Sequence, residues 1–264
     1  MRLLFWNTYN NRDINKYIWG MVEENKIDIV ILAEYNSDIK QLDQLLMNSS
    51  KRLHRWSTIG SERIKIWGNY IDVQPGIQDK YYSLQVVNGE CIICGVHMFS
   101  NMNGERNDER QVLAFQVMRE IDELKKKINS DKVIIVGDMN ESPYEKTCLS
   151  ARGFHGLPAL MEEDDKYRRV SGTIYEKMYN PMWNLFGDFS YPPGTYYLSE
   201  SKLCTPSWYM IDQIIISHSM INILKRDDLK IIVECMGEKF YTKKKHPDKK
   251  ISDHFPVMCG FEIM

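Results

Sequence analysis

Short runs of Ile, Val, Leu and aromatic residues recur along the whole chain, and each is bounded by Gly, Asn, Asp or Ser. Runs of this length and composition are typical of buried strands. Asn88-Gly89 separates two of the runs, and this dipeptide between strands predicts a tight hairpin. We predict strands over residues 2–6, 28–33, 64–67, 81–87, 91–97, 132–136, 210–217, 230–233 and 255–261.

Longer segments with helical spacing lie between some of these strands, at residues 14–24, 38–47 and 108–128. A shorter helix is expected after Pro143, because proline suits a first helical turn. Helices between some strands and direct hairpins between others indicate a mixed sheet, or two packed sheets with helices outside. On the longest helix, the expected buried face consists of Val112, Phe115, Ile121 and Leu124.

The composition fits a globular protein with a sizeable core. The chain has 264 residues, 43% of them hydrophobic, and contains no internal repeat, low-complexity tract or linker. We therefore expect one domain over residues 1–264. There are 34 Lys and Arg against 36 Asp and Glu, a net charge of -2. This balance argues against attachment to nucleic acid by global charge alone, and leaves a local basic patch open.

The first residues, MRLLFWNTYNNRD, have a brief apolar run broken by Asn7 and no small-residue cleavage site, so no signal peptide is expected. No run reaches the ~18 apolar residues of a membrane span. We expect a soluble cytoplasmic protein without a membrane partner.

Six cysteines are scattered along the chain, which is not the pattern of a disulfide framework. Cys91 and Cys94 form a C-x-x-C sequence within a predicted strand. Residues three apart on a strand point to opposite faces, so these two thiols could not share a metal ion. Buried, unpaired cysteines are the better interpretation.

Polar residues suited to metal binding and acid–base chemistry stand at the ends of the predicted strands. In a mixed or antiparallel sheet, the end of one strand lies beside the start of its neighbour, so such residues can converge at one edge. Carboxylates, carboxamides and imidazoles there match the ligands of a hard cation such as Mg²⁺. Each residue alone could be a turn former or a packed side chain, and the ordered set carries the signal. The set is Asn7, Glu34, His97, Asp138, Asn140, Asp212, Asp253 and His254.

Six short motifs occur in the order and rough spacing of the endonuclease/exonuclease/phosphatase superfamily, which the chain resembles from Trp6 to His254. The superfamily includes deoxyribonucleases, abasic-site endonucleases, deadenylases, inositol-polyphosphate 5-phosphatases and sphingomyelinases. The resemblance implies a four-layer α/β/β/α sandwich of two mixed sheets flanked by helices. It also implies phosphodiester hydrolysis that depends on Mg²⁺ or Mn²⁺. The motifs are Phe5-Trp6-Asn7, Leu32-Ala33-Glu34, Gly95-Val96-His97, Gly137-Asp138-Met139-Asn140, Ile211-Asp212 and Ser252-Asp253-His254.

The resemblance implies roles for the metal-binding and water-activating residues. Glu34 would be the principal metal ligand, with Asn7 and Asp253 close to the metal directly or through water. Asp138 would orient or deprotonate the attacking water, and Asn140 would bind the phosphate.

It also implies roles for the two histidines. Asp212 would polarise or orient His97, and His97 would hydrogen-bond the phosphate or protonate the leaving oxygen. His254 would contact the phosphate or act as general base. Met139, Met210 and Gln213 depart from common family patterns, which puts substrate contacts inferred from relatives in doubt.

Two segments bear on the substrate. Residues 167–209 carry eleven aromatic side chains, and residues 239–250 carry six lysines. Together they suggest nucleic acid as substrate, with rings for unstacked bases and lysines for phosphates. The alternatives are an aromatic region packing its own small core and a solvated lysine loop. A small-molecule or lipid phosphoester substrate, or an inactive binding protein, also remains open. The residues predicted to bind substrate are Asn140, Lys243, Lys244 and Lys245.

Overall fold

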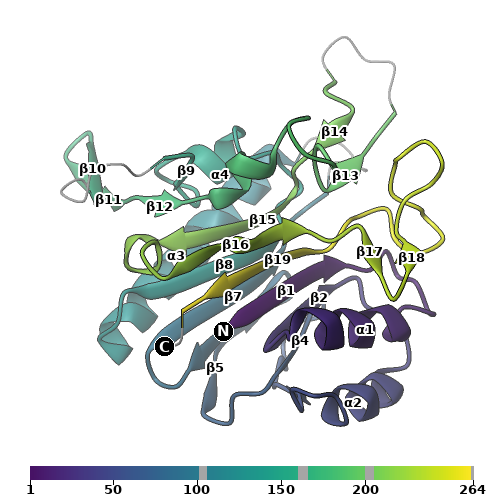
Figure 1. Ribbon diagram of the computed structural model, residues 1–264. Helices are drawn as coiled ribbons and strands as arrows, with labels where there is room; N and C mark the ends of the chain where they lie inside the picture. The colour runs from purple at the N-terminus through teal and green to yellow at the C-terminus, as the bar shows by residue number, and fades with distance from the viewer. Residues whose placement is uncertain (101–105, 160–165, 200–204, 263–264) are drawn as a thin grey trace.

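The computed structural model describes residues 1–100, 106–159, 166–199 and 205–262. Two large mixed sheets pack face to face, with helices on the outside (Figure 1). The first sheet has the order β16 (Leu224–Ile231), β19 (Val257–Phe261), β1 (Arg2–Asn7), β2 (Ile29–Ala33), β4 (Ile64–Gly68) and β3 (His54–Arg55). The second has the order β5 (Val73–Asp79), β6 (Tyr82–Val87), β7 (Cys91–His97), β8 (Lys132–Asp138), β15 (Asp212–Ser217), β12 (Met178–Tyr179) and β9 (Gly156–Leu157).

Besides the two large sheets, the described residues form three small antiparallel strand pairs, here called hairpins, and two short 3-10 helices. The hairpins pair β10 (Tyr167–Val170) with β11 (Thr173–Glu176), β13 (Tyr196–Tyr197) with β14 (Trp208–Tyr209), and β17 (Glu234–Cys235) with β18 (Glu238–Lys239). The 3-10 helices are η1 (Pro181–Leu185) and η2 (His218–Met220).

Three hydrophobic clusters separate four layers. One lies between the sheets and contains Phe5, Ile31 and Val136. A second lies under α1 (Asn15–Asn25) and α2 (Ile39–Met47), on the outer face of the first sheet. The third lies under α3 (Asn107–Ile128) and α4 (Lys146–Leu149), on the outer face of the second sheet. The predicted α/β/β/α sandwich is therefore confirmed.

The local signals in the sequence correspond to real elements. Asn88 and Gly89 connect β6 to β7 with φ angles of 52° and 66°, the left-handed conformations that a tight hairpin turn requires. Cys91 faces the core between the sheets, whereas Cys94 faces α3, so the two thiols point to opposite faces as predicted. Cys204 lies outside the described residues, and the other five cysteines are unpaired.

The predicted buried face of α3 was partly wrong. Ile121 is buried, but Val112 and Phe115 are 68% and 53% exposed. The buried stripe instead runs from Arg110 through Leu113, Ala114 and Val117. A polar anchor sets this rotation of the helix, because a fully buried guanidinium must face its partners.

That anchor is Arg110, whose Nε donates to Glu141 Oε1 at 2.8 Å. Its Nη1 donates to the Phe99 carbonyl at 2.7 Å, and Glu141 also accepts from the backbone N–H and hydroxyl of Thr147 at 2.9 Å. The network joins α3 to the segments that follow β7 and β8. β7 and β8 end with the predicted site residues His97 and Asp138, and Asn140 lies in the segment that follows β8.

Segments distant in sequence meet in the first sheet. β19 lies between β16 and β1, and Arg2 pairs with Gly260. The two ends of the chain therefore lie close together in Figure 1. β16 begins six residues earlier than the predicted strand at 230–233, and a register shift between Lys225 and Lys230 accounts for its irregular pattern. No helix among the described residues is long and apolar enough to cross a membrane.

Candidate active site

The strand register brings the predicted residues to one end of the sandwich. In the second sheet, His97 is paired with Asp138, and Asp138 is paired with Asp212. In the first sheet, Asn7 is paired with Ala33, directly before Glu34. These paired residues form one row in each sheet. Both rows lie at the same side of the molecule, near β13 and β14 in Figure 1.

Asn7 connects the two rows across the gap between the sheets. Its side-chain nitrogen donates to Asp138 Oδ2 at 2.9 Å and lies 3.5 Å from Glu34 Oε1. His97 Nε2 lies 3.4 Å from Glu34 Oε1 and 3.7 Å from Asp138 Oδ2. These four side chains form one polar cluster, although each comes from a different strand end.

Glu34 is held at the mouth of this cluster. It follows β2 with a φ of 50°, a left-handed conformation that turns the chain sharply. Asn10 donates to Glu34 Oε2 at 2.8 Å, and the Glu34 side chain keeps 29% of its surface exposed. Asn10 was missed in the sequence because a turn asparagine has no distinguishing pattern.

Asp212 pairs with His254. Nδ1 of His254 lies 2.9 Å and 3.1 Å from the two carboxylate oxygens of Asp212. The expectation that Asp212 orients His97 was therefore wrong, because Asp212 stands on β15, on the side of β8 away from β7. The His254 backbone is fixed by Ser252 Oγ at 3.1 Å and by the Trp6 indole N–H at 2.9 Å.

Asn140 does not continue the strand of Asp138. β8 ends at Asp138, and Asn140 has a φ of 49°. Its backbone N–H donates to Asp138 Oδ1 at 2.9 Å, and its amide nitrogen donates to the Met98 carbonyl at 3.2 Å. The Gly137–Asn140 motif therefore ends in a turn. The Asn140 backbone N–H in this turn holds one oxygen of Asp138, and the Asn7 side chain, from β1, holds the other.

Burial sets the protonation of the site. It raises the pKa of Asp138 to about 7, with the neighbouring Asp212 adding to the rise. It lowers the pKa of His97 to about 3, so His97 is neutral. Burial alone would also lower the pKa of His254, but Asp212, Asp138 and Asp253 outweigh it and raise this pKa to about 10. His254 is therefore a buried imidazolium held against a carboxylate.

The donor set fits a hard divalent cation. Asp253 Oδ1 is buried without a hydrogen-bond partner among the described residues, and its closest charged neighbour is His254 Nε2 at 3.7 Å. Ligand atoms of Asp138, Asp212 and His254 also lie within 4.8 Å of one another, but His254 and Asp212 already satisfy each other. The oxygen donors that remain for a metal are thus the unpartnered Asp253 Oδ1 and the partly exposed Glu34 carboxylate, which suit Mg²⁺ or Mn²⁺.

A basic cavity adjoins the Glu34 side of the site. It has a volume of about 530 Å³, and its walls include Glu34, His97, Arg63, Lys65 and Lys80. The three cations were not identified in the sequence. The signal was present, because Arg63 and Lys65 alternate with the buried Ile64 and Ile66 of β4.

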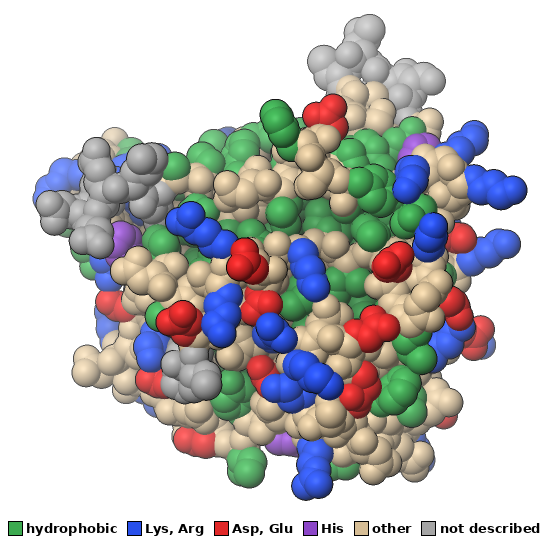
Figure 2. All heavy atoms as spheres, in the orientation of Figure 1, with side chains coloured by type: hydrophobic (Ala, Val, Ile, Leu, Met, Phe, Trp, Pro, Cys, Tyr) green, Lys and Arg blue, Asp and Glu red, His purple; other side chains and the backbone are tan. Residues whose placement is uncertain are grey.

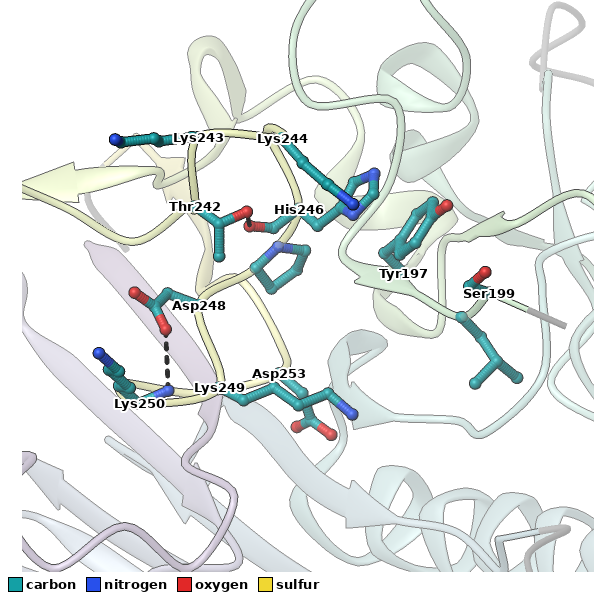
Figure 3. A pocket seen from close by; sticks show the side chains of 12 residues that line it. Tyr197, Ser199, Thr242, Lys243, Lys244, His246, Asp248, Lys249, Lys250 and Asp253 are labelled. Carbon is teal, nitrogen blue, oxygen red and sulfur yellow. Dashed lines mark hydrogen bonds between the residues drawn. The ribbon is translucent and has the colours of Figure 1, made fainter.

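Another cavity, of about 950 Å³, adjoins the Asp253 side (Figure 3). Lys243 and Lys244, two of the predicted substrate-binding residues, lie in its wall. Lys245 does not, because its Nζ lies over the rings of Tyr191 and Tyr241, 4.8 Å and 4.4 Å from their centroids. Its prediction as a substrate contact therefore has no support from the geometry.

Solved structures with the same architecture include enzymes bound to DNA. A 3' phosphatase, NExo, from Neisseria, bound to product DNA hairpin, matches with a TM-score of 0.60 and 16% identity over 100% of both chains. D. rerio TDP2, complexed with single strand DNA product, matches with 0.59 and 16%, over 100% of this chain and 99% of the other. An AP endonuclease from Archaeoglobus fulgidus matches with 0.57 and 12%, over 100% of both chains. At these identities the likeness concerns the fold.

No curated protein matches this sequence. A family model does match, over residues 83–262, which is more than half of the chain and includes most of the second sheet, from β6 onward, and the His254 segment. The chain belongs to the Endonuclease/Exonuclease/phosphatase family.

Proposed function

We propose that this protein is a metal-dependent phosphodiesterase that hydrolyses nucleic acid. The observation that carries the proposal is the position of Asn7, which joins the Glu34 and Asp138 carboxylates next to the His254–Asp212 pair. Hydrolysis of a phosphodiester requires a positioned water, neutralised phosphate oxygens and a stabilised leaving oxygen. The cluster offers a side chain for each requirement.

Asp138 is the group that orients the attacking water and accepts its proton. Asn7 and the Asn140 backbone N–H each hold one of its oxygens, so the carboxylate keeps a fixed direction. A raised pKa near 7 suits a group that takes a proton at neutral pH. Asn140 stands beside it and contributes its amide to the phosphate.

His254 and His97 act on the phosphate from two sides. His254 carries a proton and a positive charge, and Asp212 fixes its ring, so its Nε2 can donate to a phosphate oxygen. His97 is neutral and lies beside Glu34 and Asp138, so it is a hydrogen-bond donor to the phosphate rather than a charged acid.

Glu34 and Asp253 would hold Mg²⁺ or Mn²⁺, with Asn7 fixing the Glu34 carboxylate. Such an ion, when bound, neutralises charge on the phosphate and acts as a Lewis acid toward the leaving oxygen. Because the Glu34 side chain is partly exposed, substrate oxygens and water can complete the coordination.

The cations around the site favour nucleic acid over a small phosphoester. One cavity has Arg63, Lys65 and Lys80 beside Glu34, and the other has lysines beside Asp253. Figure 2 shows Lys and Arg side chains gathered at the right edge, where Figure 1 draws the yellow loop beside β17 and β18. A polymer with several phosphates can use both cavities, whereas a single phosphoester needs neither. Hydrolysis of a small-molecule or lipid phosphoester is the alternative.

The proposal predicts cleavage of single- or double-stranded DNA, or RNA, by the purified protein in Mg²⁺. The assay compares these polymers with bis(p-nitrophenyl) phosphate and a phosphomonoester, each with and without the metal. Faster turnover of a polymer, by roughly an order of magnitude or more in kcat/KM, is the expected result because distant phosphate contacts position the scissile bond. Turnover of only the small esters would contradict the nucleic-acid assignment.

Replacement of Lys243 and Lys244 by Ala should weaken nucleic-acid binding about equally for all sequences. The slope of log K against log salt should flatten by roughly 0.7–0.9 for each lost phosphate contact. Lys126→Ala with Lys127→Ala is the matched control, because this exposed pair lies at the end of α3, near the start of β8 and away from Asp138. Equal salt slopes for the two double variants between about 50 and 200 mM salt would exclude the loop from binding.

A further inference from the structure

Two stacked rings line the cavity beside Asp253, and a third ring packs against them. Tyr197 and His246 stack with centroids 3.5 Å apart and an interplanar angle of 13°. Trp208 meets them edge-on, at 5.3 Å from Tyr197 and 6.1 Å from His246. Tyr197 comes from β13 and His246 from the lysine loop (residues 239–250), so two segments that looked separate in sequence meet here (Figure 3).

The β13–β14 hairpin ties this cavity to the catalytic histidine. Tyr196 pairs with Tyr209, and Tyr197 pairs with Trp208. Because side chains alternate along a strand, adjacent tyrosines point to opposite faces. The Tyr196 ring lies 4.9 Å from the His254 ring, and the Tyr197 ring faces the cavity. One short strand therefore contacts both the reacting centre and the ring pair.

The lysine loop is held in one conformation. The Thr242 N–H donates to the His246 carbonyl, and the Lys245 N–H donates to the Thr242 carbonyl, both at 2.9 Å. The Tyr191 hydroxyl donates to the Lys245 carbonyl at 2.8 Å. The alternative of a freely solvated loop does not fit these contacts. A ring fixed before binding costs less entropy when a ligand stacks on it.

The chemistry of the walls identifies the class of ligand. Lys244 extends toward the ring pair and Lys249 extends beside Asp253 (Figure 3). An aromatic platform next to ammonium groups is the combination that binds unpaired nucleotides, with the ring stacking on the base and the lysines on its phosphates. Asp253 belongs to the same wall, so a base on the platform belongs to a nucleotide adjoining the scissile phosphate.

We propose that the Tyr197–His246 pair is the subsite for an unstacked nucleobase next to the scissile phosphate. This inference rests on the proposed function, and it specifies the substrate as nucleic acid that is single-stranded or frayed at that position. A base in an intact duplex is stacked on its neighbours on both sides and cannot reach the platform.

A double-mutant cycle between protein and substrate tests the subsite. Single-stranded oligonucleotides lacking one base at a time, replaced by a tetrahydrofuran residue, are compared for wild type and Tyr197→Ala. With the complete substrate, kcat/KM should fall by roughly 5- to 150-fold, the equivalent of about 1–3 kcal/mol for one stacked base. The loss should vanish when one particular base beside the cleaved bond is absent, because the ring then has no partner.

Two protein variants serve as controls. Tyr197→Phe keeps the ring and should retain wild-type kcat/KM, and Tyr167→Ala removes a half-exposed tyrosine on β10 and should do the same. An equal loss for every substrate, including those that lack a base, would overturn the subsite.

The two hypotheses fail in different ways. If wild type cleaves no nucleic acid, the proposed function is wrong. Binding of an oligonucleotide carrying 2-aminopurine then tests the subsite alone, because stacking on a ring quenches its fluorescence. Quenching by wild type and Tyr197→Phe but not by Tyr197→Ala supports the platform, and equal quenching by all three contradicts it.

Discussion

Chelation of divalent metal with EDTA should abolish phosphodiester cleavage, and Mg²⁺ or Mn²⁺ should restore it. The reason is the charge of the site. The carboxylates of Glu34, Asp138, Asp212 and Asp253 converge with one imidazolium, and Asp253 Oδ1 has no hydrogen-bond partner among the described residues. A buried carboxylate oxygen without a partner is costly and the summed negative charge repels a phosphate, so we expect a bound cation to bring the phosphate into this field.

Glu34→Gln should weaken metal binding while keeping the shape of the side chain. The expected readouts are a higher Mg²⁺ concentration for half-maximal activity and a smaller shift in Tm on Mn²⁺ addition. Glu62→Gln is the matched control, because Glu62 lines the same cavity but pairs with Lys80 on the surface. Full activity in EDTA, or the same metal dependence for both variants, would contradict the assignment of Glu34.

Asp138→Asn and His254→Ala should each reduce kcat by roughly 10²–10⁴-fold, the usual contribution of a general acid or base. Asp138→Asn replaces a buried carboxylate by an amide of the same size, so the fold should persist. His254→Ala leaves the buried Asp212 without its partner and should also lower stability. His254→Gln is therefore included, because its amide can still donate to Asp212.

The double variant Asp138→Asn with His254→Gln distinguishes a joint mechanism from two independent effects. If the two groups act on one transition state, the combined loss should be smaller than the product of the single losses. Circular dichroism melts check that each variant is folded. Near-wild-type turnover of either single variant with normal metal binding would show that the roles are misassigned.

Much of the fold could be predicted because its signals are local. The strands are short apolar runs, and the turn at Asn88-Gly89 needs only two residues. The order of polar residues at the strand ends also gave the candidate set, since their meeting follows from any arrangement in which strand ends face one another. The geometry of the cluster agrees with that expectation for residues from Asn7 to His254.

The partners within the site could not be predicted, because they depend on the order of strands in the sheets. β15 lies beside β8, and β7 lies on its other side, so Asp212 meets His254 and not His97. The rotation of α3 failed for a related reason. Val112 and Phe115 fit a hydrophobic face, but buried Arg110 must reach Glu141, which lies 31 residues away in sequence. Long-range polar contacts override the local pattern.

The position of β19 orders events during synthesis. β19 follows its neighbour β1 by about 250 residues, so a ribosome adding roughly 5–20 residues per second delivers it about 10–50 s after β1. Until then, one edge of β1 has no β19 to pair with, and such an edge is prone to join other chains. Asp253 and His254 stand just before β19. A nascent chain therefore acquires these two site residues only just before the strand that completes the first sheet.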